Sequence, residues 1–206
     1  MARPRTVSDE RILAETRAAV RLKGPAVSLD TIAARIGLSQ PALLKRFGTR
    51  NKLFIAALRP PERPPFLPRL EAGPDDRPLV VQLEELFGDM ADFFDDVAPC
   101  ISALRESGIP PSEVDRKPFG LYTLNGLIGW LKRAVEKGLA DVADPEGAAV
   151  ALLASIFMPA MLTHHLGKRT WKRDARQMVG PMSSLWAKAF QVQPAVRAHQ
   201  EEGPQP

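Results

Sequence analysis

The fold of this chain is decided by the stretch Ile32–Leu53, IAARIGLSQPALLKRFGTRNKL. Its apolar residues recur at helical spacing and then stop at Gly37, a residue that permits a tight turn. A second helix is expected at once, because Ser39 can cap it and Pro41 falls in its first turn, where a missing backbone N–H costs nothing. Two short helices around one glycine have the layout of a helix-turn-helix, which lays its second helix in the major groove of DNA. Many small helical domains share this layout, so a helical core that happens to be basic stays an alternative.

Helices are also expected on both sides of this stretch. Four runs of helical periodicity each follow a residue that can cap a helix, and these residues are Ser8, Ser28, Ser39 and Thr49. Gly24-Pro25 ends the first run, since glycine permits the turn and proline cannot continue the helix. We therefore expect a domain of three to four helices over residues 1–58, which we call the head.

The charge of the chain is concentrated in the head. The net charge of the 206 residues is only +4, but residues 1–59 hold 12 Lys and Arg against 4 Asp and Glu, and the remainder is mildly acidic. A basic head on an acidic body favours a polyanionic partner such as nucleic acid. A solvated basic surface without a partner is the alternative that composition alone leaves open.

A proline-rich connector is expected over residues 59–78. Seven of the chain's 20 prolines fall between Pro60 and Pro78, which is incompatible with a long helix and typical of an extended, semi-rigid spacer. Recognition of this segment by a partner protein is the alternative to a spacer.

The residues after the connector are predicted to be helical, and we call residues 79–192 the body. Helical spacing begins at Val80, and a short separate helix is expected from Pro99 to Ser107. Long helices are predicted over Asp144–Leu166 and Arg173–Phe190.

The expected fold class is therefore all-α, with an N-terminal helix-turn-helix domain followed by a helical bundle. Residues 193–206 are polar and are expected to form a flexible tail.

The uncharged run Gly147–Thr163 raises the question of a membrane span. It has 17 residues, fewer than the roughly 20 that a spanning helix needs, and it contains Ser155 and Pro159. A helix that is apolar on all sides can equally be buried on all sides. We therefore expect the helices over 144–166 and 173–190 to form a homodimer interface, with no membrane contact.

No pattern in the body favours catalysis, a metal or a cofactor. His164 and His165 are neighbours that point to different sides of a helix, which is poor geometry for a metal site. The sequence contains no glycine-rich phosphate loop and no nucleophile elbow. The lone Cys100 permits no internal disulfide and, with no apolar segment at the N-terminus, favours a cytoplasmic protein. A buried inert thiol is the expected role of Cys100, and a reactive or redox-sensing thiol is the alternative.

The head resembles the N-terminal domain of TetR-family transcriptional regulators over about Arg11–Leu58. The residues that carry the resemblance fall in the family's order and spacing, and they are Ile12-Leu13, Gly24, Ile32-Ala33, Gly37-Leu38-Ser39, Ala42-Leu43, Phe47 and Leu53. The resemblance implies a cytoplasmic homodimer that binds a partly palindromic double-stranded DNA operator, most often as a repressor, and that a small effector releases.

The resemblance also implies which residues contact DNA. The recognition helix would be Gln40–Phe47, in which Gln40 can bridge adenine N6 and N7. The residues that we expect at the DNA are Ser28, Ser39, Gln40, Pro41, Ala42, Leu44, Lys45, Arg46 and Arg50. For the serines plain helix capping is the alternative, and for Lys45 it is a solvated surface position.

The chain departs from the family's pattern at Leu44, where the family commonly has a tyrosine whose hydroxyl donates to a phosphate. Leucine cannot make this hydrogen bond, which is worth roughly 1 kcal/mol. We expect Arg46 and Arg50 to compensate in part.

The body is expected to bind a small apolar effector between its helices. The candidate lining residues are Phe94, Leu104, Tyr122, Asn125, Trp130, Phe157 and His164. An ordinary core is the alternative for each apolar member. Two other functions stay open: a helical ligand-binding protein or enzyme whose basic head is incidental, and a constitutive DNA-binding regulator without effector.

Overall fold

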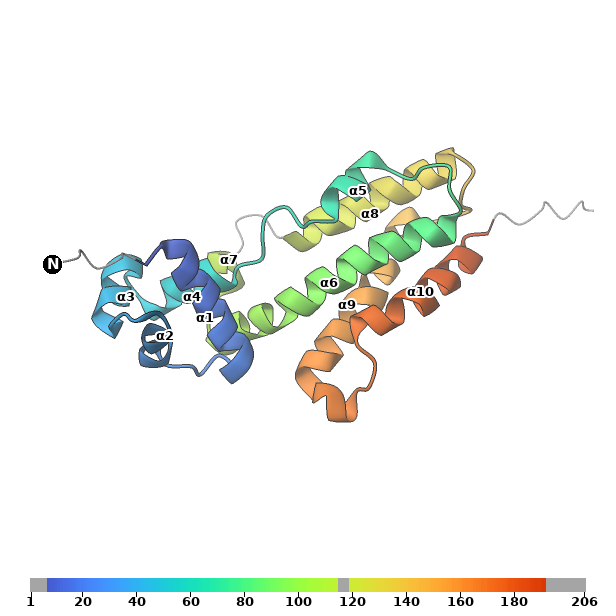
Figure 1. The fold of residues 1–206 in the computed structure, drawn as a ribbon. Helices are drawn as coiled ribbons and strands as arrows, with labels where there is room; N and C mark the ends of the chain where they lie inside the picture. Colours follow the sequence, from blue (N-terminus) through green and yellow to red (C-terminus); the bar gives the residue numbers. More distant parts are fainter. Residues whose placement is uncertain (1–6, 115–118, 192–206) are drawn as a thin grey trace, which may run out of the picture.

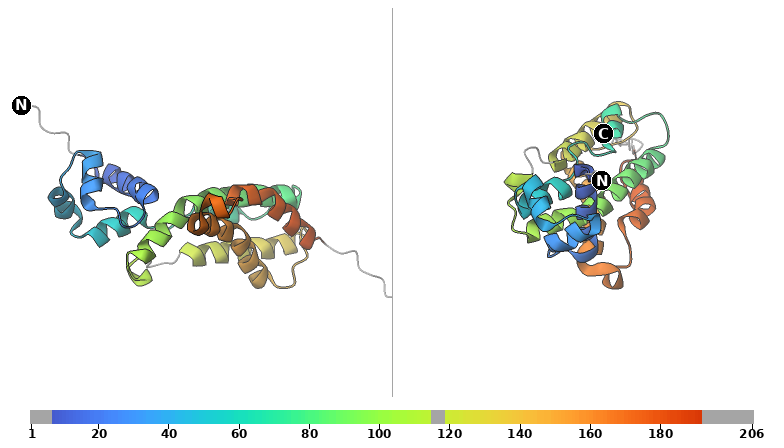
Figure 2. Two further views of the ribbon diagram at one scale, coloured as in Figure 1. Left: turned by 90° about the horizontal axis from the view of Figure 1, so that it is seen from below. Right: turned by 60° about the vertical axis from the view of Figure 1, so that its left-hand side comes forward.

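A computed structural model describes residues 7–114 and 119–191 of the chain. Within these residues the protein is all-α, as predicted, and contains no strand. The molecule is elongated, with the head at one end and the long helix α6 leading from it into the body (Figures 1 and 2). The helices are α1 (Asp9–Lys23), α2 (Leu29–Ile36), α3 (Gln40–Phe47), α4 (Arg50–Leu58), α5 (Leu67–Ala72), α6 (Leu79–Glu106), α7 (Pro111–Val114), α8 (Phe119–Glu136), α9 (Pro145–Thr170) and α10 (Ala175–Ala189).

The four helices of the head begin where the sequence predicts them, because each of the four cap residues accepts a backbone hydrogen bond. Ser28 Oγ accepts from the N–H of Thr31 at 3.1 Å, and Ser39 Oγ accepts from the N–H of Ala42 at 3.3 Å. The turn between α2 and α3 depends on Gly37, whose φ of 67° lies in the left-handed region that glycine adopts without strain. Local signals alone therefore define the helix-turn-helix.

The core of the head is closed by the far end of α6. Ile12, Ile32, Leu43 and Phe54 are all at most 1% exposed in this core. Four residues from the end of α6 and just beyond it are buried in the same cluster: Cys100, Ala103, Leu104 and Ile109. The head is therefore not a free-standing unit that ends at residue 58, since residues 100–109 complete it.

Helix α6 corrects the predicted break at Pro99. The sequence indicated a separate short helix from Pro99 to Ser107, but α6 is one continuous helix of 28 residues with Pro99 inside it. An interior proline removes one backbone hydrogen bond and costs about 3 kcal/mol. Packing of α6 against α9 and α10 on one side of Pro99 and against α1 and α4 of the head offsets that cost.

The connector also differs from the expected extended spacer. It contains the helix α5, which packs on α8, and Phe66, Leu67 and Leu70 are buried in the core of the body. Arg133 of α8 donates to the carbonyl of Leu70 at 2.5 Å and so satisfies the end of this short helix. Residues 59–78 are therefore largely packed onto the body.

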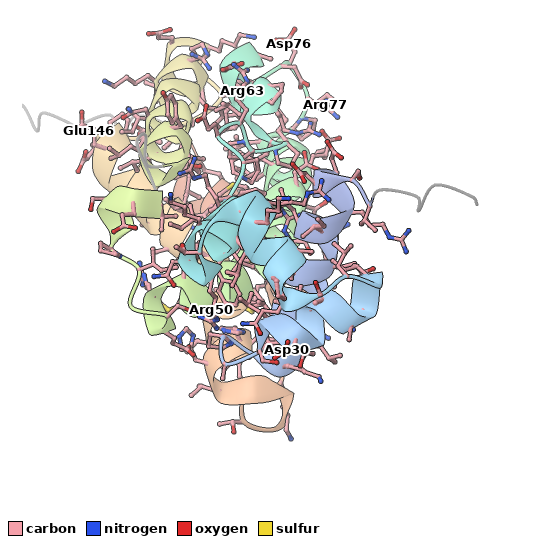
Figure 3. The ribbon with its side chains drawn as sticks, turned by 90° about the vertical axis from the view of Figure 1, so that its left-hand side faces the viewer. Asp30, Arg50, Arg63, Asp76, Arg77 and Glu146 are labelled. Carbon is pink, nitrogen blue, oxygen red and sulfur yellow. The ribbon has the colours of Figure 1, made fainter. Side chains whose placement is uncertain are left out.

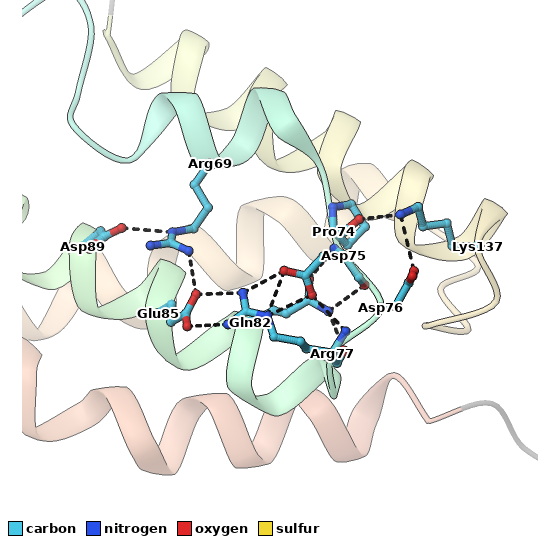
Figure 4. A network of polar contacts seen from close by, with 9 residues as sticks. All are labelled: Arg69, Pro74, Asp75, Asp76, Arg77, Gln82, Glu85, Asp89 and Lys137. Atoms are coloured by element: carbon cyan, nitrogen blue, oxygen red, sulfur yellow. Dashed lines mark hydrogen bonds and ion pairs between the residues drawn. The ribbon is translucent and has the colours of Figure 1, made fainter.

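A polar network fixes the end of the connector to α6 and to Lys137, the residue after α8 (Figure 4). Arg69 forms ion pairs with Glu85 and Asp89 of α6, and Arg77 bridges Asp75 and Glu85. The Arg77 guanidinium hydrogen-bonded to Glu85 lowers the pKa of that carboxyl below its ordinary value. The exposed groups of this network hold the connector in one path along the bundle.

Helices α9 and α10 leave an apolar surface uncovered. Val150 and Met158 of α9 and Leu185 of α10 are each at least 50% exposed. In the part of the chain that is described, one helical stretch, Pro145–Leu166, is long and apolar enough to cross a membrane, and only 28% of it is buried within the protein. Pro145–Leu166 is therefore long enough for a membrane-spanning helix, whereas the shorter uncharged run Gly147–Thr163 is not.

Candidate nucleic-acid interface

Helix α3 has one apolar side held in the head and one side open to solvent. Leu43 is 1% exposed and anchors the helix between α2 and α4. Pro41, Lys45 and Arg46 are exposed, and Gln40 is partly exposed. The side of α3 that faces solvent therefore carries polar and cationic groups that can meet base edges and phosphates.

The serines at the starts of α2 and α3 are committed to capping. Ser28 and Ser39 are exposed, and each hydroxyl accepts a hydrogen bond from the third residue of its own helix. The remaining free N–H groups of these two helix starts are available to an anion. Ala42, also expected at the DNA, is partly exposed next to them.

Arg50 is held by the head itself. Its guanidinium donates to the carbonyls of Pro25 and Val27 and lies 4.0 Å from the centre of the Phe54 ring. This cation–π contact and the two carbonyl contacts tie the start of α4 to the loop between α1 and α2. Figure 3 looks onto the head end of the molecule and labels Arg50. A guanidinium with these partners is a positioning group for the loop, with fewer donors left for phosphate.

Arg46 is also held by a neighbouring element. It forms an ion pair with Asp9 at the start of α1, and it donates to the carbonyl of Val7 at 2.5 Å. The expected compensation for Leu44 by Arg46 and Arg50 therefore requires each guanidinium to share its donors with partners in its own chain.

The lysines of this surface are uncommitted. Both Lys45 of α3 and Lys52 of α4 are exposed, and among the described residues neither side-chain ammonium group has a hydrogen-bond or ion-pair partner. A lysine is a compact point charge on a flexible stem, which suits contact with a phosphate at variable geometry. Both ammonium groups are therefore available to contact a phosphate.

Leu44 lies at the edge of the core of the head. It is partly buried and packs against the same cluster as Phe47. The side chain that stands in place of the family's tyrosine thus contributes apolar packing to the head and offers no donor to DNA.

The candidate effector residues of the body do not converge on one cavity. Phe94 and Phe157 are in edge-on contact, with ring centres 5.2 Å apart, and they line an apolar hollow of about 110 Å³. Trp130 is 2% exposed in the core of the body, whereas Leu104 belongs to the core of the head.

The polar candidates lie elsewhere. Tyr122 and Asn125 are exposed on α8, and His164 lines a separate hollow with Asp95, Pro99 and Asp174. Burial lowers the pKa of His164 below its ordinary value. No group of three or more metal-ligating side chains occurs in the described ranges 7–114 and 119–191.

Sequence reasoning missed the joint between head and body. Arg21 of α1 donates to the carbonyl of Asp96 of α6 at 2.6 Å and pairs with its carboxylate at 2.9 Å, while Arg17 donates to the carbonyl of Ala57 within the head at 2.9 Å. The only signal was the spacing of Arg17 and Arg21, one helical turn apart on the same side of α1. The same spacing is equally typical of two arginines on a solvated surface. The sequence alone therefore does not identify this contact between head and body.

The N-terminal part of the chain matches a known family. Residues 12–57 match the model described as "Bacterial regulatory proteins, tetR family". No curated protein sequence matches the chain.

Solved structures share the fold over nearly the whole chain. A putative TetR-family regulator from Mesorhizobium loti has a TM-score of 0.66 at 16% identity, covering 89% of this chain and 96% of its own. A TetR regulator from Haloarcula marismortui has a TM-score of 0.67 at 19% identity, covering 88% and 97%. SmeT, the repressor of the multidrug efflux pump SmeDEF of Stenotrophomonas maltophilia, has a TM-score of 0.65 at 18% identity and covers 98% of both chains. At these identities the likeness shows the fold, and the family match is confined to residues 12–57 of the head. The head thus matches the TetR family of bacterial regulatory proteins, and the chain as a whole shares the fold of solved TetR-family regulators.

Proposed function

We propose that this protein is a cytoplasmic, ligand-responsive transcriptional repressor that binds a partly palindromic operator as a homodimer. The observation that carries the proposal is the surface of α3, which is anchored by the buried Leu43 and presents Gln40 and Lys45 to solvent. In a helix-turn-helix this surface enters the major groove, where a glutamine reads adenine and a lysine reaches guanine or phosphate. Matches to TetR-family structures over most of the chain support the same reading.

Dimer formation is proposed through α9 and α10, within the predicted ranges 144–166 and 173–190. The exposed apolar residues Val150 and Met158 lie eight residues apart on α9, and Leu185 lies on the neighbouring α10. A second copy placed on this surface would bury it, which accounts for a helix whose composition would suit a membrane. The two heads of a dimer must then present their α3 helices about one DNA turn apart, roughly 34–36 Å.

An apolar effector is proposed for the hollow between Phe94 and Phe157. The hollow is closed by apolar groups and by Thr123 and Gly120 of α8. Its size, about 110 Å³, is small compared with the roughly 300–1,000 Å³ of most ligand pockets. This small size favours the second candidate function, a constitutive regulator without effector, unless α8 and α9 separate when a ligand binds.

The experiment is selection of binding sites from random double-stranded DNA, followed by gel shifts on the selected sequence. A dimeric regulator should yield an inverted repeat, and Gln40→Ala should lose about 1–3 kcal/mol of preference for one base pair in each half. The matched control is Gln191→Ala, which removes an exposed glutamine far from α3.

Two results would point to other functions. Weak binding without sequence preference, unchanged in Gln40→Ala, would favour a helical ligand-binding protein or enzyme with an incidental basic head. An operator that no small apolar compound releases would favour the constitutive regulator.

A further inference from the structure

We propose that the joint between head and body is a binding site for a monocarboxylate with an apolar chain. The joint contains a partly open hollow of about 330 Å³ between α1, the end of α4 with the start of the connector, and α6. It is separate from the apolar hollow at Phe94 and Phe157 and from the surface of α3, so it belongs to neither proposed site. Its volume lies at the lower end of the range of about 300–1,000 Å³ in which small ligands bind.

The charge of this hollow favours an anion. Three guanidinium groups line it, those of Arg17, Arg21 and Arg59, and Asp96 is the only acidic residue among its lining residues. The Arg21–Asp96 ion pair uses that single carboxylate. Two positive charges therefore remain without a carboxylate partner at the hollow. A guanidinium group can hold a carboxylate through two parallel N–H···O hydrogen bonds.

Arg59 has an unused donor at this place. One terminal nitrogen of its guanidinium donates to the carbonyl of Glu113 at 3.3 Å. Its Nε is buried and has no hydrogen-bond partner in the part of the chain that is described. A buried N–H without an acceptor is costly, and a bound carboxylate oxygen would supply the acceptor.

The rest of the wall favours an apolar chain on that anion. Leu58, Phe93 and Val97 are each at most 7% exposed, and Pro60 and Pro61 complete the wall with Cys100. Inorganic phosphate has no apolar part to match this wall, whereas a hydrocarbon chain could pack against it. The combination of cationic and apolar walls therefore points to an amphipathic monocarboxylate.

A ligand in this hollow would contact head and body together. Its carboxylate would lie among residues of α1 and the connector, and its chain would lie on α6. Occupancy would therefore favour the relative placement of head and body in which both sets of contacts form. Binding itself does not require that the protein recognise an operator, so the test below is made without DNA.

Cys100 provides a reporter that is specific to this hollow. It is the chain's only cysteine, it lines the hollow, and it is 2% exposed. Burial raises the pKa of its thiol, so all rates are compared at one pH. The full chain is treated with methyl methanethiosulfonate, a small neutral reagent, with sodium octanoate, 1-octanol or inorganic phosphate present, and modification is followed by mass spectrometry. With octanoate at about ten times its dissociation constant, modification should slow about tenfold, because only the unliganded chain reacts.

Variants separate this site from any other place where octanoate binds. Arg59→Gln should abolish most of the protection, whereas the control Arg63→Gln should retain it, since Arg63 is exposed and pairs with Glu71 outside the hollow. Equal protection by octanol or by phosphate would overturn the proposal, and so would protection that survives in Arg59→Gln. If Arg59→Gln does not fold, the comparison of octanoate with octanol on the unaltered chain still decides the matter.

Discussion

The head and the body bury their apolar side chains to different extents. Nine large apolar side chains are strongly exposed among the described residues, and Leu22 is the one that belongs to the head. The other eight lie on the body, three of them on the adjoining surfaces of α9 and α10: Val150, Met158 and Leu185. The head completes its core within one chain and offers charge to solvent, whereas the body leaves apolar surface for something else to cover.

This difference assigns separate physical tasks to the two regions. A surface of lysines and partly exposed polar groups attracts a polyanion from a distance and loses strength as salt is added. An apolar surface acts only in contact and is insensitive to moderate salt. The proposed operator binding and the proposed dimer formation should therefore respond to different substitutions and to different solution conditions.

The largest effect is expected from removing the anchor of α3. Leu43→Ala should lower the free energy of unfolding by about 2–5 kcal/mol, because the side chain is 1% exposed and its loss leaves a cavity. Leu44→Ala is the matched control and should cost only about 1 kcal/mol, since Leu44 is partly buried. Urea denaturation followed by circular dichroism measures both. Equal costs at the two positions would contradict the assignment of Leu43 alone to the core.

The next effect concerns the apolar surface of the body. Leu185→Glu should weaken the proposed dimer about 10- to 100-fold, because burial of such a side chain contributes about 1.5–3 kcal/mol. Sedimentation equilibrium at several protein concentrations measures the change. Leu121→Glu on α8 is the control, as Leu121 is exposed to a similar extent but lies outside the proposed interface. Weakening by both substitutions would place the interface elsewhere.

A smaller effect is expected from the uncommitted cation on α3. Lys45→Ala should reduce the slope of log affinity against log salt concentration by about one, since one phosphate contact is lost. Operator titrations by fluorescence anisotropy at several salt concentrations measure the slope. Lys132→Ala, an exposed lysine of α8, removes the same charge from the body and should leave the slope unchanged. An identical change in both variants would mean that only overall charge matters.

The smallest effect is expected at the departure from the family's pattern. Leu44→Tyr should tighten operator binding by about 1 kcal/mol, because the new hydroxyl can donate to a phosphate. Leu44→Phe supplies the ring without the hydroxyl and is the control. The measurement is the same anisotropy titration, and a gain of equal size in both variants would attribute the effect to packing. No gain in Leu44→Tyr would mean that the docking register differs from the one the family resemblance implies.

The parts of this fold that the sequence predicted well are those with local causes. Ser28 and Ser39 cap helices through hydrogen bonds from residues three positions ahead. Gly37 adopts the left-handed conformation of the turn, which glycine can take without strain. Such signals lie within a few residues of the structure they specify, so one sequence suffices to read them.

The parts that it missed depend on distant partners. Helix α5 forms because Leu67 and Leu70 are buried against α8 and because Arg133, 63 residues after Leu70, bonds to its last carbonyls. Helix α6 continues through Pro99 because its neighbours hold both sides. The internal partners of Arg46 and Arg50 could not be foreseen either, since a long cationic side chain has no pattern that distinguishes a phosphate from a carbonyl of its own chain.

The burial of Cys100, Ala103, Leu104 and Ile109 with the core of the head has a practical consequence for exchanging parts between regulators. A fragment cut after residue 58 would leave Phe54 and Leu58 without part of their apolar cover. Grafting this head onto another body would therefore succeed only if the end of α6, residues 100–109, travels with it. The part that must be transferred to keep the head folded is thus made of two chain segments, which are separated by the connector and most of α6.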